Sequence, residues 1–488
     1  MWRASKVLFL VLICNCSFGQ KGTHTPYSVF GLGELKSNDY AAYMSMGGVS
    51  IAGTDSTMVN HSNPASYAFI GRYRPIFQIG LDSRLSTFET SDASTNQRFL
   101  GFNQFQLGIP IKKHWGAAIG IKPYSFTGYE ISNYVTNDDG DTTALYNNEG
   151  SGGINKFYLG VAYNPLHKVT TFQKPITYKD TTGAKIADTI NYRKEHYLSL
   201  GANANYLFGS SSRLRSFQYA SSLSGLNSKV DNSLRFSGLT YEFGLNYQYK
   251  WSSSNRDGGN SKAHSIAIGL TYSPSISVRA FQDLYSYSYL NFGGFNGSEI
   301  TSDTIEYITD NQGTVVIPES YNAGFEYRIG PRFSQNSSLV KIAGDVRYQK
   351  WSAYSENFGA TYTNELKDRL SVGLGIEWTP VTQVDPGITS FLNKLHYRIG
   401  ATYTMTELRV LNNMNNYTDL NAYGMSFGLG IPITVIKKSN TNINFGANIG
   451  NLGTTENGLI REKYVGLFFG ISITPGVGDL WFLKRKYD

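Results

Sequence analysis

The sequence is poor in charged residues, in cysteine and in long apolar runs. Asp, Glu, Lys and Arg make up 16% of its 488 residues, compared with about 25% in an average soluble domain. The two cysteines, Cys14 and Cys16, both lie in an apolar stretch near the start of the chain. Beyond that stretch, no apolar run reaches the ~18 residues that a membrane-spanning helix requires. The composition therefore excludes spanning helices, and it excludes disulfide chemistry in a chain that is cleaved after residue 19.

Motifs for catalysis and metal binding are also missing. The sequence contains no Walker loop, no HExxH motif, no nucleophile elbow and no Cys/His spacing typical of a metal site. Solvated or interfacial positions account for the histidines better than ligand roles do, because the seven are scattered: His24, His61, His114, His167, His196, His264 and His396. We therefore predict that the protein is not an enzyme and that it uses no cofactor and no metal.

Residues 1–19 have the pattern of a secretory signal peptide. Arg3 and Lys6 precede the apolar run Val7–Cys14, and small residues follow before Gln20. Removal of these two cations lowers the formal net charge from +7 to about +5. So mild an excess suits anionic lipid headgroups rather than nucleic acid.

The stretch from 338 to 380 shows an alternation of apolar and polar residues that is typical of β-strands. Alternate residues are apolar or small from Val340 to Tyr348 and again from Leu370 to Trp378. A period of two indicates extended strands with two different faces. In a soluble sandwich the apolar faces would meet in a dry core, whereas in an outer-membrane barrel they would face lipid and the polar faces would line the lumen.

The same alternation recurs in fourteen candidate strands. They are expected at 75–88, 100–111, 115–127, 153–164, 196–209, 236–251, 262–280, 320–330, 338–354, 368–380, 393–407, 421–435, 441–453 and 460–474. Alternate connections are short, such as Lys112–His114, and the others are long, such as Gly128–Gly152 and Phe281–Glu319. Short turns alternating with long loops on an even number of strands are typical of bacterial outer-membrane barrels. Pro165–Glu195 breaks the rule, and is either an inserted periplasmic hairpin or a sign of miscounted strands.

These patterns predict an all-β fold, a single closed 14-stranded antiparallel transmembrane β-barrel over residues 75–488. Closure removes the strand edges that lipid could not satisfy. Aromatic residues beside the connections, such as Trp115, Trp251, Trp351 and Trp378, are expected to form interfacial belts rather than core packing. Residues 20–74 show little alternation and many glycines, so we expect them to form an N-terminal plug, or hatch.

The chain resembles the outer-membrane long-chain fatty-acid and aromatic-hydrocarbon transporter family (FadL/TodX-like), in the form found in Bacteroidetes. The resemblance rests on Met46 to Ala52 and Asn63-Pro64-Ala65, with further pieces at 115–125, 158–163, 206–209, 317–319, 345–351, 428–432 and 481–482. It implies a fourteen-stranded barrel, a lumen closed by a hatch, and passage of hydrophobic molecules from outside. The plug residues concerned are Gly47, Gly48, Asn63, Pro64 and Ala65.

Three sets of residues are candidate sites. The lumenal polar set is Glu326, Arg328, Lys341, Asp345, Arg347, Glu377 and Arg398, which form either a self-paired wall that holds the plug or a station for a ligand carboxylate. The predicted outer loop carries the apolar set Phe281, Leu284, Tyr285, Tyr287, Tyr289, Phe292 and Phe295, which either captures ligand, packs on itself or docks a partner. Pro123 cannot donate to a strand ladder, so it either opens a side exit toward lipid or ends its strand at the outer rim.

The leading functional prediction is a passive channel of the bacterial outer membrane that takes up hydrophobic small molecules, fatty-acid-like or aromatic. Its gate would be the plug, and its exit could be lateral at Pro123. The alternative is a plugged barrel that acts as a structural or docking subunit of a secretion or barrel-assembly complex. A third alternative is a lipid-modifying outer-membrane enzyme. The expected partners are outer-membrane lipid or lipopolysaccharide, a hydrophobic small molecule and other envelope proteins, but no nucleic acid.

Overall fold

The computed structural model describes residues 23–36, 39–179, 185–220, 225–254, 262–292, 298–331, 338–359, 361–362, 366–380, 391–433 and 440–475. The long strands are β2 (Ile76–Glu89), β3 (Ser94–Lys112), β4 (Trp115–Thr136), β5 (Thr142–Lys179), β6 (Lys185–Tyr219), β7 (Asn227–Ser254), β8 (Lys262–Ser273), β9 (Ile276–Phe292), β10 (Ser298–Ile317), β11 (Ser320–Pro331), β12 (Leu339–Gln349), β15 (Arg369–Thr379), β16 (His396–Leu411), β17 (Tyr417–Ile433), β18 (Asn440–Leu452) and β19 (Arg461–Thr474). The short elements are η1 (Pro26–Val29), β1 (Glu34–Leu35), α2 (Ala41–Met44), η2 (Pro64–Phe69), η4 (Trp351–Ala353), β13 (Ser355–Asn357), β14 (Thr361–Tyr362), η5 (Phe391–Lys394) and η6 (Glu456–Gly458). Within these residues, no helix is long and apolar enough to span a membrane.

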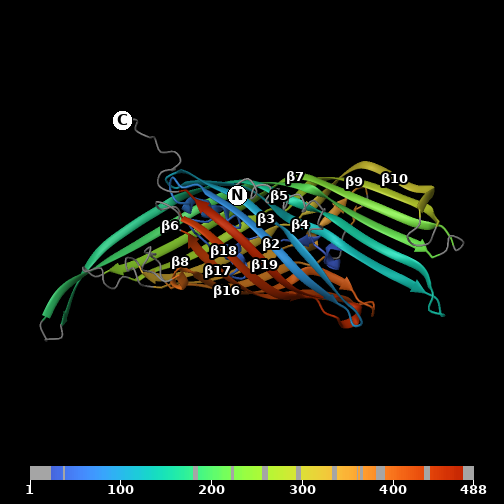
Figure 1. The fold of residues 1–488 in the computed structure, drawn as a ribbon. Coiled ribbons are helices and arrows are strands. Elements are labelled where there is room, and N and C mark those ends of the chain that lie inside the picture. The colour runs from blue at the N-terminus through green and yellow to red at the C-terminus, as the bar shows by residue number, and fades with distance from the viewer. Residues whose placement is uncertain are drawn as a thin grey trace, which may run out of the picture.

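The long strands form a closed antiparallel barrel (Figure 1). The β2 strand pairs with β3 on one side and with β19 on the other, and this pairing closes the wall. β8 and β9 both pair with β7 and are separated by Pro274, so together they make one interrupted strand. β10 and β11 continue one another in the same way across Pro318. Counted so, the described residues form the fourteen-stranded barrel that the sequence predicts.

The alternation has the direction expected for a membrane barrel. On β12 and β15, Val346 and Leu374 are 47% and 57% exposed on the outside. Lys341, Asp345 and Glu377 are buried in the lumen at 4%, 4% and 6% exposure. An apolar exterior around a charged interior is the reverse of a soluble sandwich. The protein is an outer-membrane β-barrel, as predicted.

The aromatic belt lies at the end of the barrel with the short turns, which is the periplasmic end. Trp115 stacks on Tyr163 with ring centroids 4.5 Å apart, and Trp251 stacks on His264 at 5.0 Å. The belt prediction is wrong for Trp351, which is 2% exposed. Its ring packs inside the outer half of the barrel, in an apolar cluster that includes Leu32 of the N-terminal segment and Ile317.

Two segments that looked like connections are strands. The predicted outer loop Phe281–Glu319 consists largely of β9 and β10, which pair with each other. The pairing of β10 with β9 contains three register shifts, which break the period of two along β10. For this reason the alternation in the sequence did not predict this strand. The insertion Pro165–Glu195 is a hairpin, the first of the two alternatives that the sequence left open, and it continues β5 and β6 with pairing as far as Lys179 and Lys185. It extends beyond the barrel at the end opposite β9 and β10 (Figure 1).

Candidate functional site

Residues 23–36 and 39–74 lie inside the barrel, and we refer to them as the plug. Its central part, from α2 to η2, fits closely against inward-facing glycines of the wall. A Cβ atom on Gly400 would lie 2.1 Å from the Gly47 nitrogen, and one on Gly244 would lie 2.2 Å from the Asn63 side chain. Gly47 itself has φ +73°, a conformation that favours glycine. The glycine-rich lumenal face therefore allows backbone-to-backbone contact with this part of the plug, which we call the plug body (39–74).

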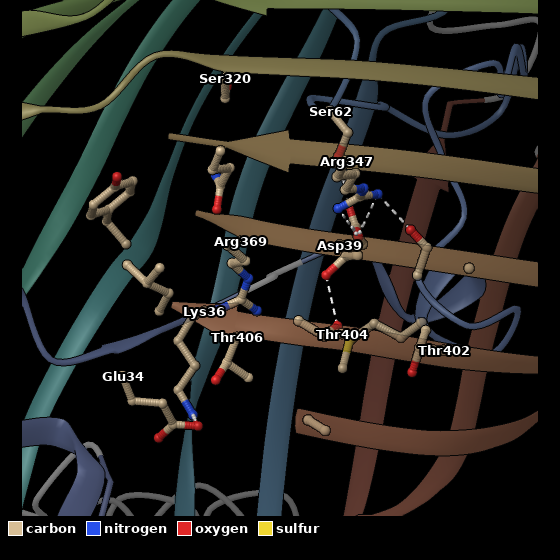
Figure 2. A pocket seen from close by; sticks show the side chains of 18 of the residues that line it. Glu34, Lys36, Asp39, Ser62, Ser320, Arg347, Arg369, Thr402, Thr404 and Thr406 are labelled. Atoms are coloured by element: carbon tan, nitrogen blue, oxygen red, sulfur yellow. Dashed lines mark hydrogen bonds and ion pairs between the residues drawn. The ribbon is translucent and has the colours of Figure 1, made fainter. Parts of the chain in front are cut away.

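Charged wall residues hold the plug body in place. The Asp345 carboxylate accepts hydrogen bonds from the backbone amides of Ser50 and Ile51 at 2.6 and 3.0 Å. The Arg347 guanidinium donates to the Gly48 carbonyl at 2.6 Å and forms an ion pair with Asp39 at 3.2 Å (Figure 2). Buried charge-assisted hydrogen bonds of this kind are among the stronger polar contacts in a protein. The plug body is thus anchored through its backbone.

The other predicted lumenal residues are gathered in the same band of the wall. Arg328 donates to the Thr54 carbonyl of the plug at 2.8 Å and also pairs with Glu326. Lys341 lies between Glu326 and Glu377, at 3.9 and 3.6 Å. Arg398 pairs with Glu377 and donates to Asn444 at 2.7 Å. These contacts match the self-paired wall that the sequence allowed, and they occupy Arg328 and Arg398 within the protein itself.

A chamber of about 470 Å³ lies between the plug and the wall. Of the predicted lumenal polar set, Asp345 and Arg347 line it. Its other charged lining comes from both the plug and the wall: Glu34, Lys36, Asp39, Asp82, Arg84, Lys122, Lys156, Glu242, Arg369 and Glu407 (labelled in part in Figure 2). Apolar lining comes from Leu207, Ile317 and Trp351, which belong to the cluster in the outer half of the barrel. The chamber therefore offers a mixed surface, charged on one part and apolar on another.

The barrel wall has a seam between β3 and β4. The ladder between these strands runs from the Lys112–Trp115 pair to the Phe105–Ile121 pair, where it ends. β4 continues for a further fifteen residues, Lys122 to Thr136, past Pro123 and a register shift in its pairing with β5. Pro123 thus lies where the β3–β4 ladder ends, well inside the strand rather than at its rim.

The first residues of the plug run along the open edge of β4. In β1, Glu34 and Leu35 pair with Phe126 and Ser125, and the Lys36 amide donates to the Tyr124 carbonyl at 3.0 Å. Ser28 continues the contact by exchanging hydrogen bonds with the backbone of Gly128. Residues 23–36, which we call the flap, therefore take the place of β3 beside the outer half of β4.

An ion cluster fastens the flap to the strands on the other side of the seam. The Glu34 carboxylate pairs with Arg84 of β2 at 2.6 Å, and Arg84 also pairs with Glu462 of β19 at 2.7 Å. Lys36 lies over the rings of Phe99 and Phe126 at 5.1 and 5.6 Å. The seam is closed by side chains and by the flap, not by a continuous ladder.

The predicted apolar set of the outer loop lies apart from this chamber. Phe281, Leu284, Tyr285, Tyr287, Tyr289 and Phe292 belong to β9, and none of them lines the chamber. Tyr289 is 1% exposed, and the Tyr285 and Tyr287 rings are 4.7 Å apart. Phe295 lies outside the described residues. These tyrosines form a packed aromatic face at the outer end of the barrel.

Sequence reasoning missed the residues that close the seam. Glu34, Arg84 and Glu462 come from three distant segments, and each looks in the sequence like an ordinary charge. It also missed His61, which is buried in contact with Lys122 and 3.1 Å from the Gln106 side chain. No group of three or more His, Cys, Asp or Glu side chains suited to a metal occurs in the ranges that the structure describes.

Comparison with known proteins places the chain in a family. A family model described as BamG matches residues 1–172 and 183–488, nearly the whole sequence. The chain belongs to the BamG family. No curated protein matches this BamG-family chain.

Solved structures similar to this BamG-family chain include the toluene transporter TbuX of Ralstonia pickettii, at 14% identity over 89% of this chain and 97% of that one, with a TM-score of 0.49. A FadL homologue of Pseudomonas aeruginosa matches at 12% identity over 89% and 98%, with a TM-score of 0.47. The toluene transporter TodX of Pseudomonas putida matches at 12% identity over 90% and 98%, with a TM-score of 0.41. The resemblance to hydrocarbon transporters suggested by the sequence is thus found again among solved structures.

Proposed function

We propose that the protein is a passive outer-membrane channel for hydrophobic small molecules, with a lateral exit at the β3–β4 seam and the flap as its gate. One observation supports this proposal above the others. The residues that close the seam, Glu34, Leu35, Lys36 and Tyr124, also line the chamber. Withdrawal of the flap from β4 would therefore join the chamber directly to the side of the barrel.

The contacts favour the flap over the plug body as the moving part. The plug body is held by Asp345 and Arg347, and its backbone packs directly against glycines of the wall. Among the described residues, the backbone of the flap pairs with the wall only through β1 and through the Lys36 and Ser28 hydrogen bonds to β4. Its side chains and carbonyls add the Glu34–Arg84 pair, the Tyr27 hydroxyl bonded to the Ile460 backbone, and a hydrogen bond from Arg213 to the Gly31 carbonyl. Segments with few buried backbone contacts open at the lowest free energy. Gating through Gly47–Ala65, which the sequence suggested, would instead require the Asp345 and Arg347 contacts and the packing against the wall glycines to break.

The chamber lining suits a ligand with an apolar body and one polar end. Lys156 and Arg369 pair with Glu242 at 4.0 Å and with Glu407 at 2.9 Å. A plain hydrocarbon would remove water from these charged groups and offer them no further polar contact, which is costly in a closed cavity. A fatty-acid-like molecule could direct its carboxylate to these cations and its chain to the apolar cluster around Leu207. The aromatic face of β9, at the outer end, would be the place of first capture.

A reversible lock on the flap tests the proposal. Leu35 and Ser125 are paired residues of β1 and β4, and paired residues in antiparallel strands have Cα atoms about 4.5–5.5 Å apart, within disulfide range. The double variant Leu35→Cys/Ser125→Cys should form the single disulfide of the cleaved chain. In liposomes, uptake of a fluorescent long-chain fatty acid should fall to the level of empty vesicles when this disulfide is oxidised, and should recover after reduction.

The control lock joins two strands that are already paired. Ser371 and Thr404 face each other across β15 and β16 in the chamber wall, with their hydroxyl oxygens 2.7 Å apart. Ser371→Cys/Thr404→Cys should leave uptake unchanged under both conditions. Uptake that never exceeds empty vesicles, or that persists with the oxidised flap lock, would refute the channel.

A second function is favoured by the periplasmic hairpin. β5 and β6 extend from Leu166 to Lys179 beyond the barrel, which at about 3.4 Å per residue is roughly 45 Å. A channel has no need of such an arm, whereas a structural subunit of an envelope complex would use it to dock. Purification in mild detergent separates the two functions, because a docking subunit should carry its partner with it and a channel should elute alone.

A further inference from the structure

The periplasmic hairpin has two faces of different charge. Residues directly opposite each other on paired strands share a face. The outward face carries Lys168 opposite His196, Thr170 opposite Lys194, and Phe172 opposite Tyr192. On the inward face, Glu195 pairs with Arg193 and also accepts a hydrogen bond from Tyr197. The cations of the inward face, Arg193 and Lys250, thus lie beside a carboxylate of that face.

The outward face is basic. Lys168, Thr170 and Lys194 are exposed, and none of the acidic side chains described in the structure pairs with either lysine. Phe172 and Tyr192 stack with centroids 5.0 Å apart, and the Lys194 ammonium lies 5.4 Å from the Phe172 ring. The aromatic pair therefore holds one of the two cations against the sheet, where it stays available to an anion.

This face continues the lipid-facing stripe of the barrel. On β6 the outward residues run from Leu200, 47% exposed, through Leu198 to His196 and Lys194. His196 lies opposite Tyr249 and Lys194 lies opposite Trp251, and these two aromatic rings stack at 5.2 Å in the periplasmic belt. Belt aromatics mark the level of the lipid headgroups. Two residues along a tilted strand advance only about 5 Å along the membrane normal, so both lysines lie at or just below that level.

We propose that Lys168 and Lys194, with His196 and Trp251, form a binding site for the phosphate headgroup of an anionic phospholipid in the periplasmic leaflet. The two ammonium groups would contact the phosphate, while Trp251 and Tyr249 pack against the glycerol and upper acyl region. The position of the lysines just below the lipid-facing leucines favours a lipid over a protein as the occupant. The site is independent of the flap and of transport.

Native mass spectrometry of the full-length mature protein in mild detergent tests the site. Phosphatidylglycerol and phosphatidylcholine would be titrated separately onto the delipidated protein. Wild type should retain phosphatidylglycerol preferentially. Because each basic residue at an anionic surface changes the binding constant about fivefold, Lys168→Gln/Lys194→Gln should weaken phosphatidylglycerol binding roughly 25-fold and leave phosphatidylcholine unchanged.

Two further variants keep the test falsifiable. Arg193→Gln/Lys250→Gln removes the same charge from the inward face of the neighbouring strands β6 and β7 and should bind phosphatidylglycerol like wild type. Lys168→Arg/Lys194→Arg should retain binding, which shows that charge rather than folding is measured. The proposal would be overturned if the two lipids bound equally, or if the inward-face control lost phosphatidylglycerol binding to the same extent. It would also be overturned if the two lysines retained an acidic protein in place of lipid.

Discussion

Replacement of Glu34 by glutamine should open the flap. In the structure, the Glu34 carboxylate is 17% exposed and lies 2.6 Å from Arg84 and 3.5 Å from Lys36. A hydrogen bond to a charged group contributes about 1.5–3 kcal/mol. The contact exists only in the closed state, so its loss destabilises that state and would raise the ratio of open to closed flap by roughly 10- to 150-fold. We expect the lower part of this range, because Glu462 still holds Arg84.

The rate of thiol labelling measures this opening directly. With Leu35→Cys as the single cysteine of the cleaved chain, a membrane-impermeant maleimide should react in proportion to the open fraction. Glu34→Gln should accelerate labelling at least tenfold. The control is Glu89→Gln, which removes an ion pair with Arg461 between the same two strands, β2 and β19, at the rim. The reasoning is refuted if Glu34→Gln labels at the wild-type rate, or if the rim control is equally fast.

Three further predictions concern the plug body and the outer surface. Gly400→Ala should destabilise the folded barrel by about 1–3 kcal/mol, seen as a lower temperature of heat-induced unfolding on gels, whereas Gly71→Ala, with 3.4 Å to the nearest atom, should not. Asp345→Asn should increase hydrogen exchange at the Ser50 and Ile51 backbone amides, because the neutral Asn side-chain oxygen is a weaker acceptor than the carboxylate oxygen to which both amides donate. Unchanged exchange at these two amides would contradict the proposal that Asp345 anchors the plug body. Burial alone would raise the pKa of Asp368, but hydrogen bonds from Ser352 and Tyr348 hold this pKa below its ordinary value. The stabilisation that ionised Asp368 gives to the adjacent turn is therefore present above about pH 4 and is lost as the pH falls further. Trp351 fluorescence should change only in that acidic range, and Asp368→Asn should remove this pH dependence.

The sequence predicted the barrel well because its signal is local. A period of two on β12 and β15 needs only neighbouring residues, and it placed Val346 outside and Asp345 inside. The β5–β6 hairpin gave no such signal, so the sequence left an inserted hairpin and a miscount of strands as open alternatives. β10 was hidden by its register shifts, which interrupt the period. Of these two segments, only β10 was predicted as a loop and is a strand.

The candidate site was predictable only in part. Asp345 and Arg347 were found because charged residues out of phase with an apolar stripe must face the lumen. Pro123 was found because a strand proline lacks a donor. The closure of the seam could not be found, because the Glu34–Arg84–Glu462 cluster joins residues whose proximity depends on the closed barrel and on where the plug turns inside it.

Hydrogen exchange of the protein in nanodiscs, with and without a long-chain fatty acid, tests the central claim most directly. If the flap is the gate and the plug body is fixed, amides of residues 23–36 should exchange at least tenfold faster when ligand is present, while those of 39–74 stay protected. Faster exchange in the plug body with a protected flap would contradict the account.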